Sequence, residues 1–354
     1  MKAVIDPSAN VYYFSFYLQG LYDVLGKKNV SFSEKYFKNL DRKGEGMWNF
    51  DANVCFVLLD DNDNVLKHIA IDFADDACNI SLTAMNWADL YFKVNINKKY
   101  NKIFYGKEQI DYSKIIQIPP YMGIRVWSLF ETIYYFITNY LKAFNNHPGF
   151  FIDYVKNYAL QYFHRQPLSS YKTTDINYKK KKYVFLACNL WKKSEHVNRT
   201  RMKFMNLCRK NQDIEFEGGF VNKENVDINE YSDLMLSRRY THKEYLKKMN
   251  KSEIAFNVPA VHNCHGWKLA EYFCMGKAIF STPFYNQIPI GIENGKNIIF
   301  IEENNMEAVF DHTFGRKLEM LQKNAKKYWD DYSCPKAVIS YIIEEAQKNN
   351  NSKQ

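Results

Sequence analysis

Short runs of apolar residues alternate with helical patterns along the first half of the chain. The runs are KAVID, VCFVLL, HIAIDF, LYFKVNI and KIIQIP, and a helical pattern from about Val11 to Leu25 follows the first of them. Strand-length apolar runs separated by amphipathic helices are typical of an α/β sheet. The polar stretch DDNDNV at residues 60–65 fits a hairpin turn, which would make this sheet mixed. Over residues 125–163 the pattern becomes helical and strongly aromatic.

A second α/β series follows residues 166–182, QPLSSYKTTDINYKKKK, which carry few large aliphatic side chains and end in four lysines. We interpret this stretch as an interdomain linker, and a long surface loop inside one domain is the alternative. The strand patterns KYVFLACNL, IEFEGGF, SEIAFNV, KAIFS and NIIFIEE then alternate with helical segments, in the order of a doubly wound nucleotide-binding domain. The sequence therefore predicts an α/β domain at 1–165, a linker at 166–182, a second α/β domain at 183–316, and C-terminal helices at 317–354 that could cross back to the first domain.

Composition narrows the class of protein. The chain has 354 residues, of which 46% are hydrophobic and 17% aromatic, as expected for a folded protein of two domains. Asp6 and Pro7 interrupt the start of the chain where a secretory signal needs an apolar core, and no apolar stretch is long enough to span a membrane. Seven cysteines without a CxxC pair fit reduced thiols, so we expect a cytoplasmic protein. Neither G-x-G-x-x-G nor a Walker loop is present, which argues against dinucleotide oxidoreductases and P-loop NTPases.

A net charge of +9 suits an anionic partner. Acidic and basic residues are interleaved except at KKKK, whereas a nucleic-acid binder should spread Lys and Arg along one face, so we expect no nucleic-acid partner. The aromatic segment WSLFETIYYFITNYLKAF has two interpretations. It is either hydrophobic core or a partly exposed surface for a lipid-linked acceptor, with peripheral association on the inner face of a membrane.

Candidate chemistry lies in HGWKLAEYFCMGKAIFSTP, residues 265–283. A helix is predicted from about Gly266 to Met275, with Lys268 in its first turn and Glu271 one turn further on the same face. A helix N-terminus with a lysine binds phosphate oxygens, and a carboxylate one turn on can accept hydrogen bonds from ribose hydroxyls, so the pair fits a nucleoside diphosphate. An ordinary Lys–Glu pair on a solvated helix face is the alternative.

The preceding HNCH, residues 262–265, invites a zinc interpretation. A closed zinc site needs four ligands at wider spacings, and no second cluster is visible, so we predict no metal site and no cofactor. A loop histidine that hydrogen-bonds a donor substrate is the preferred interpretation, with His265 beside Gly266 as the candidate.

The layout of two α/β domains resembles the GT-B glycosyltransferases, which are built from two Rossmann-like domains facing across a cleft. KLAEYFCMGKAIFST is similar to their donor-domain motif, in which a glutamate begins a helix leading to Gly-x-Pro-Val-Val. This resemblance implies that Glu271 binds the donor ribose. Many retaining members carry E-x7-E, and here Asn263 stands in place of the first glutamate, which argues for an inverting mechanism.

The second half also resembles the inverting α1,3-fucosyltransferases and related bacterial enzymes. FLACNLWKKSEHVNRTRMKFMNLC is similar to their strand and Arg-bearing helix, and YLKKMNKSEIAFNVPAVHNCHGWKL to their strand, loop and Lys-containing helix start, although Gly266 and Trp267 replace the acidic residue before that lysine. The resemblance implies that Arg199 or Arg201 joins Lys268 around the donor diphosphate, where fixed cations substitute for a metal ion. The donor-binding candidates are therefore Arg199, Arg201, His265, Gly266, Lys268 and Glu271.

An inverting transferase needs a general base, and Asp6 and Asp72 lie at predicted strand ends where an acceptor site would be. The alternative is that both are turn or cap residues. We predict a metal-independent glycosyltransferase that transfers a sugar from a nucleotide-diphosphate-sugar donor to a glycan or lipid-linked saccharide acceptor, in bacterial surface polysaccharide biosynthesis. A non-catalytic nucleotide or nucleic-acid binding protein of the same fold is the competing hypothesis.

Overall fold

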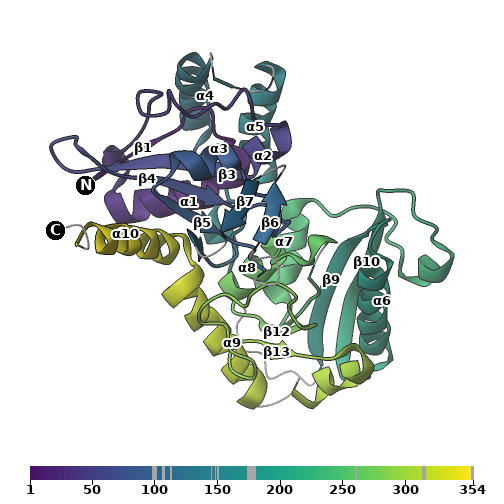
Figure 1. Cartoon of the computed structure of the whole chain (residues 1–354). Coiled ribbons are helices and arrows are strands. Elements are labelled where there is room, and N and C mark those ends of the chain that lie inside the picture. The colour runs from purple at the N-terminus through teal and green to yellow at the C-terminus, as the bar shows by residue number, and fades with distance from the viewer. Residues whose placement is uncertain are drawn as a thin grey trace. The chain divides into compact units, whose positions relative to one another are not determined.

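The chain forms two compact units in a computed structural model that describes residues 1–97, 102–105, 108–111, 114–144, 146–147, 149, 151–173, 181–259, 261–312 and 316–351. Unit 1 comprises Met1–Leu168 and Tyr332–Gln354, and unit 2 comprises Ser169–Asp331 (Figure 1). Each unit has a sheet of its own with helices packed on it, so the predicted α/β class is confirmed. Of the predicted linker at 166–182, residues 174–180 lie outside the described residues, and the arrangement of two domains across a cleft stays a prediction.

Unit 1 contains a mixed six-stranded sheet in the order β2-β1-β3-β4-β5-β8. Its strands are β1 (Lys2–Ile5), β2 (Val30–Phe32), β3 (Asn53–Leu59), β4 (Val65–Asp72), β5 (Leu90–Lys93) and β8 (Ile115–Gln117). β3 pairs antiparallel with β1 and β4, and the other neighbours are parallel. The predicted hairpin turn joins β3 to β4, because the Asp60 carboxylate accepts hydrogen bonds from the backbone N–H groups of Asn62 and Asn64. A separate hairpin is formed by β6 (Lys102–Tyr105) and β7 (Glu108–Asp111).

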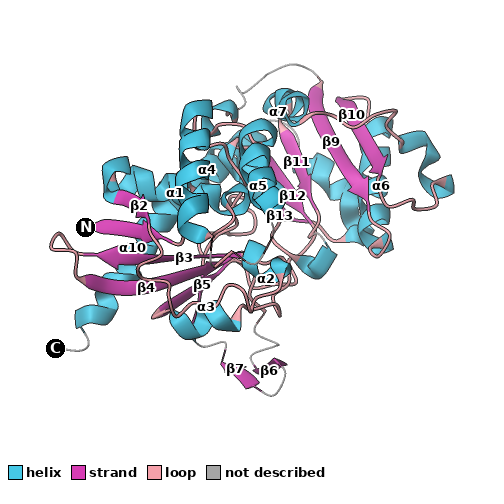
Figure 2. Ribbon diagram, turned by 90° about the horizontal axis from the view of Figure 1, so that it is seen from above, coloured by secondary structure: helices cyan, strands magenta, loops and turns pink. Residues whose placement is uncertain are grey.

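Six α-helices are described in unit 1: α1 (Val11–Leu25), α2 (Met47–Asp51), α3 (Leu82–Trp87), α4 (Leu129–Ala143), α5 (Phe151–His164) and α10 (Pro335–Asn351). The long helical pattern predicted over residues 125–163 is thus two helices, α4 and α5, that pack against each other. α1 contacts both α5 and α10, and this contact brings the end of the chain to the N-terminal unit (Figure 2). None of the helices within the described residues is long and apolar enough to cross a bilayer.

Unit 2 contains a parallel five-stranded sheet in the order β10-β9-β11-β12-β13. Its elements are β9 (Lys182–Leu190), α6 (Glu195–Lys210), β10 (Ile214–Asn222), α7 (His242–Lys251), β11 (Ile254–Asn257), α8 (Trp267–Cys274), β12 (Ala278–Ser281), β13 (Ile299–Phe300) and α9 (Arg316–Tyr328). In chain order the strands lie 2-1-3-4-5, which is a doubly wound arrangement. Gly218 and Gly219 in β10 have φ of 143° and 154°, and a Cβ on Gly218 would lie 2.0 Å from the Leu186 carbonyl oxygen of β9. The glycine pair therefore permits the close approach of these two strands.

Candidate functional site

The neighbouring strands β9 and β11 separate before their carboxyl ends. Among the described residues their only register pair is Ile254 with Val184, although β9 continues to Leu190 and β11 to Asn257. At this point the strand order reverses, and doubly wound sheets bind ligands outside the carboxyl ends of the strands at such a reversal. The Ala187 carbonyl of β9 accepts a hydrogen bond from Lys268 Nζ at 2.6 Å, so the lysine of α8 reaches into this separation.

A second cation, Arg201, approaches the same place from α6. Arg201 is only 8% exposed, and its buried Nη1 has no hydrogen-bond partner within the described residues. Shielding from water lowers the pKa of Lys268, and the positive charge of Arg201 acts in the same direction, whereas Cys188 and Glu271 oppose it. Two cations shielded from water in one place make a site that favours an anion.

The structure separates the two arginines that the sequence left as alternatives. Two positions along an α-helix correspond to about 200° of rotation, so Arg199 and Arg201 lie on opposite sides of α6. The Arg199 side chain is 58% exposed and pairs with Glu195 at 2.7 Å and with Glu230 at 3.3 Å. Arg201, rather than Arg199, is thus the cation beside Lys268.

The N-termini of α6 and α8 lie at this edge of the sheet and lack side-chain caps, as does that of α2 in unit 1. The first residues of α1, α3, α4 and α7 are capped by the side chains of Asn10, Ser81, Ser128 and Thr241. Neither Ser194 before α6 nor Gly266 before α8 makes a side-chain cap, and nothing lies within 4 Å of the place where a Cβ of Gly266 would be. A helix N-terminus that no side chain caps is suited to an anion, because its N–H groups and dipole both favour negative charge.

Glu271 faces α7 rather than Lys268. Its carboxylate accepts a hydrogen bond from the Tyr245 hydroxyl at 3.0 Å, and His242 Nε2 lies 3.8 Å from it. The side chain is buried, and no Lys268–Glu271 ion pair occurs among the described residues, so the solvated surface pair is not formed. Lys268 Nζ lies 5.7 Å from the centroid of the Tyr245 ring, which places the tyrosine next to both charges.

The loop between β11 and α8 has an unusual backbone. His262 and Asn263 have φ of 70° and 55°, a left-handed conformation that non-glycine residues adopt rarely and that occurs often at functional sites. His265 is buried, and its Nε2 lies 2.9 Å from the Gln287 carbonyl oxygen. Burial lowers the pKa of His265 to about 4 in spite of that carbonyl, so the ring is neutral near pH 7 and fixes the loop before Gly266.

A hollow of about 460 Å³ lies at the carboxyl edge of the unit 2 sheet. Its walls come from the segments that follow β11, β12 and β13 and from the first turn of α6, and include His196, Val258, Asn263, Thr282, Glu302 and Glu303. Ligand pockets commonly have volumes of roughly 300–1,000 Å³, so the space suits part of a nucleotide sugar.

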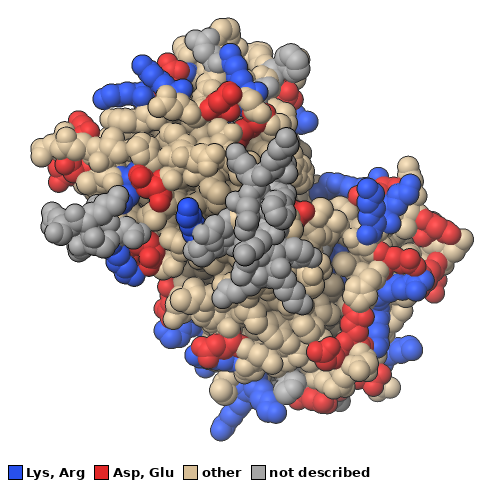
Figure 3. All heavy atoms as spheres, viewed as in Figure 1, with Lys and Arg blue, Asp and Glu red and all other residues tan. Residues whose placement is uncertain are grey.

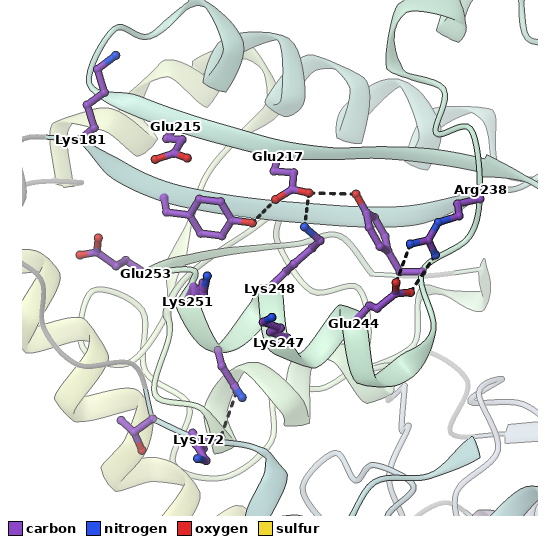
Figure 4. Close-up of a pocket in the computed structure, with 14 residues that line it drawn as sticks. Lys172, Lys181, Glu215, Glu217, Arg238, Glu244, Lys247, Lys248, Lys251 and Glu253 are labelled. Carbon is purple, nitrogen blue, oxygen red and sulfur yellow. Dashed lines mark hydrogen bonds and ion pairs between the residues drawn. The ribbon is translucent and has the colours of Figure 1, made fainter. Parts of the chain in front are cut away.

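A larger hollow of about 940 Å³ lies in unit 2 between α7 and the first halves of β9 and β10 (Figure 4). In it, Glu217 accepts hydrogen bonds from Tyr183 at 2.6 Å, from Tyr240 at 3.2 Å and from Lys248. Arg238 forms a two-pronged pair with Glu244 at 2.6 and 2.9 Å (Figure 4). The smaller hollow is the better candidate for a donor because it lies at the carboxyl edge of the sheet, although neither Arg201 nor Lys268 is among the residues that line it.

Asp6 and Asp72 are both 1% exposed and lie in unit 1. Asp6 accepts hydrogen bonds from Arg42 Nε at 2.9 Å and from the hydroxyl of Ser8 at 2.6 Å. Asp72 lies 2.9 Å from Lys93 Nζ and accepts a hydrogen bond from the Tyr91 hydroxyl at 2.5 Å. A general base needs a lone pair that can reach the acceptor hydroxyl, and these contacts favour the alternative in which both aspartates hold local structure.

The described residues contain no group of three or more His, Cys, Asp or Glu side chains placed to hold a metal ion. Residues that the sequence analysis missed include Tyr245 and His242, which contact Glu271, and Cys188, which lies beside Lys268. Their neighbours in sequence give no sign of this, because they belong to ordinary strand and helix patterns that only the fold brings together.

Neither a protein-family model nor a curated protein sequence matches the chain. Among solved structures it is similar to the GtfA/B complex, with 10% identity and a TM-score of 0.37 over 75% of this chain and 47% of that chain. It is also similar to the pneumococcal O-GlcNAc transferase GtfA in complex with UDP and GlcNAc, with 10% identity and a TM-score of 0.39 over 83% of this chain and 67% of that one. A third similar structure is a glycosyltransferase from Rickettsia africae ESF-5, with 14% identity and a TM-score of 0.35 over 73% of this chain and 63% of that one.

The chain thus spans about half the length of the GtfA/B structure. Likenesses at these TM-scores assign no family to the chain, and its function has to be inferred from its own residues.

Proposed function

We propose that the chain is a glycosyltransferase whose nucleotide-diphosphate-sugar donor binds at the carboxyl edge of the unit 2 sheet. The observation that carries this proposal is the buried Arg201, whose Nη1 has no partner in the described part of the chain, next to the half-buried Lys268. The two cations lie where β9 and β11 separate, and α6 and α8 begin nearby without side-chain caps. A diphosphate supplies the negative charge that this arrangement lacks.

The same cations suit the chemistry of sugar transfer. Negative charge grows on the diphosphate as the glycosidic bond to the donor breaks, so fixed cations that contact it stabilise the transition state more than the ground state. Arg201 and Lys268 would supply that stabilisation directly. We further propose an inverting transfer to a glycan or a lipid-linked saccharide in surface polysaccharide biosynthesis, with Glu271 contacting the ribose if it exchanges the Tyr245 hydroxyl for the sugar diol.

The competing hypothesis is a non-catalytic nucleotide or nucleic-acid binding protein. Lys and Arg side chains are interspersed with Asp and Glu on the face drawn in Figure 3, and no continuous basic stripe crosses the described part of it. A nucleic-acid backbone needs a row of cations, so this face does not favour nucleic acid. A nucleotide-binding protein without catalysis would share the donor site and is distinguished by the absence of turnover.

The test begins with a thermal-shift screen of UDP-, GDP-, CMP- and dTDP-linked sugars on the full chain. A ligand at about 100 times its dissociation constant adds about 2.7 kcal/mol to the free energy of unfolding. Donor hydrolysis is then measured with the nucleotide sugar that stabilises the protein most. The assay is repeated with Lys268→Met, which removes one of the two proposed cations. Lys296→Met is its matched control, because Lys296 belongs to the same unit and forms an exposed ion pair with Glu293. No stabilisation by any donor would reject the proposal, and stabilisation without hydrolysis or transfer would favour the non-catalytic hypothesis.

A further inference from the structure

The helices α4 and α5 expose an unusual number of large apolar side chains. Of the 20 large hydrophobic residues that are exposed in the described part of the chain, 11 lie between positions 129 and 163. They are Leu129, Phe130, Ile133, Tyr134, Ile137, Leu141 and Phe144 in or next to α4, and Phe151, Ile152, Val155 and Phe163 in α5. We call this set the α4–α5 face. Phe130 alone is 84% exposed.

The spacing of these residues gives each helix an exposed apolar stripe. Positions 130, 133, 134, 137, 141 and 144 repeat every three or four residues, so they form one stripe along α4. The residues that α4 turns inward are Thr132, Asn139 and Ala143, and those of α5 are Tyr154, Tyr158 and Gln161. The inner side is apolar as well, since Tyr135 stacks on Trp127 and Phe136 packs against Tyr154 and Tyr158, so the exposed stripe is apolar surface beyond that used by the core of unit 1.

Polar contacts fix the helices in this orientation. Asn139 Nδ2 donates a hydrogen bond to the Tyr158 hydroxyl at 3.1 Å, and the Tyr154 hydroxyl donates one to the Pro7 carbonyl at 2.9 Å. Turning the apolar stripes inward would break these buried hydrogen bonds, each of which is costly to lose without replacement. The exposed stripe therefore does not result from loose packing of the pair, and exposed apolar patches of this kind mark interaction sites.

Cations and an exposed tryptophan border one end of the face. Lys142 Nζ donates a hydrogen bond to the Phe32 carbonyl at 2.8 Å, and Asn146 Nδ2 donates one to the Leu40 carbonyl at 3.2 Å, so residues 33–43 run beside the end of α4. That segment exposes Lys35, Lys38 and Lys43 against two acidic side chains, Glu34 and Asp41. Met47 lies against Gly149 at the start of α5, and its neighbour Trp48 is 65% exposed.

If two copies of the chain met through the α4–α5 face, the partner copy would offer few carboxylates to pair with these lysines. Glu131 and Asp153 are the only acidic residues in α4 and α5. Glu131 is engaged by Lys27 and by the capping box of Ser128, and Asp153 has a partner of its own. An anionic phospholipid surface, by contrast, offers phosphates to the lysines, an interfacial layer to the tryptophan and tyrosines, and acyl chains to the apolar stripes.

We propose that the α4–α5 face docks on an anionic phospholipid bilayer, with both helices lying in the plane of the interface. This inference concerns unit 1 alone and goes beyond the proposed transferase activity, because none of the residues that carry it belongs to the donor site. A membrane-bound position would suit an acceptor that is itself anchored in lipid.

The test is cosedimentation of the full chain with vesicles of phosphatidylcholine, with or without phosphatidylglycerol. We expect binding to the anionic vesicles that weakens as salt is added, since charge attraction to lipid headgroups is screened. The triple variant Phe130→Ser, Ile137→Ser, Leu141→Ser should bind at least about 10-fold more weakly, because each substitution removes a large apolar side chain from the interface. Lys38→Glu with Lys43→Glu should weaken binding to anionic vesicles and reduce its dependence on salt.

A matched control removes as many exposed apolar side chains elsewhere. The triple variant Ile228→Ser, Ile290→Ser, Met320→Ser changes unit 2 residues that are similarly exposed, and it should bind vesicles as the unchanged protein does. Stabilisation by the nucleotide sugar should persist in both triple variants, so this test is independent of the donor proposal. The inference is overturned if the unchanged chain does not bind anionic vesicles, if the control variant loses as much binding, or if the chain dimerises and only the α4–α5 variant becomes monomeric.

Discussion

Replacing Lys268 by methionine should separate binding of a nucleotide from stability of the fold. Methionine keeps most of the side-chain length and removes the ammonium group. The change deletes the charged hydrogen bond to the Ala187 carbonyl, which contributes about 1.5–3 kcal/mol in typical proteins. It also removes a buried charge beside a second cation, and burial first and the charge of Arg201 second lower the pKa of Lys268. We therefore expect the free energy of unfolding without ligand to change by less than about 1.5 kcal/mol.

The effect on ligand binding should be larger. Loss of one charged contact to a diphosphate, about 1.5–3 kcal/mol, raises the dissociation constant roughly 10- to 150-fold. At a donor concentration of about 100 times the original dissociation constant, the ratio of ligand to dissociation constant then falls to between about 10 and 0.7. Ligand-induced stabilisation should accordingly drop from about 2.7 kcal/mol to between about 1.4 and 0.3 kcal/mol.

The assay is denaturant unfolding of both proteins with and without the nucleotide sugar that the thermal screen selects. Arg201→Met should behave like Lys268→Met, and Arg199→Met provides the matched control on the same helix, because its side chain is exposed and paired. If Lys268→Met keeps the full ligand-induced stabilisation, or if Arg199→Met loses as much as Arg201→Met, the placement of the diphosphate is refuted.

Three further predictions concern stability. Burial lowers the pKa of Lys277 to about 7 from its usual 10.5, so above pH 7 the unfolded chain holds more protons than the folded one. The free energy of unfolding should therefore rise between pH 7 and 9 by about 2–3 kcal/mol more than in Lys277→Met. Equal pH dependence of the two proteins would contradict this. Gly218→Ala should lower the free energy of unfolding by about 3 kcal/mol or more, because the new Cβ would meet a backbone carbonyl of β9. Gly26→Ala, in open space at φ 80°, should lower it by about 1–2 kcal/mol. Similar denaturation midpoints for the two variants would refute the steric argument. Arg42→Met should cost about 3–5 kcal/mol, because it leaves the buried carboxylates of Asp6 and Glu45 unpaired, and a normal melting temperature would exclude that role.

Much of the fold was accessible from the sequence because apolar periodicity reports local structure. The helix at Val11–Leu25, the strands of unit 2 and the hairpin turn after β3 all follow from such patterns. β2 was missed because three residues, VSF, are too few to show a period. The orientation of α4 was not accessible either, since an amphipathic pattern identifies a stripe but not the direction in which the stripe faces.

The candidate donor site was accessible from the sequence only in part. Lys268 could be found because it follows the predicted start of a helix, a local feature of the sequence. The separation of β9 from β11, which exposes the Ala187 carbonyl to that lysine, depends on pairing between segments about 70 residues apart. No local pattern encodes such a pairing, because register is set by the packing of the whole sheet.

One signal in α6 distinguishes Arg201 from Arg199 in the sequence itself. The apolar positions 197, 204, 205 and 208 follow the helical period, and Arg201 falls on their stripe while Arg199 does not. A charged residue on such a stripe is either paired inside the protein or held for a ligand. Arg42 is an example of the first case, since Asp6 and Glu45 both pair with it. Arg201 pairs with no carboxylate among the described residues and lies near a second cation, and the diphosphate that we propose as ligand would supply the balancing charge.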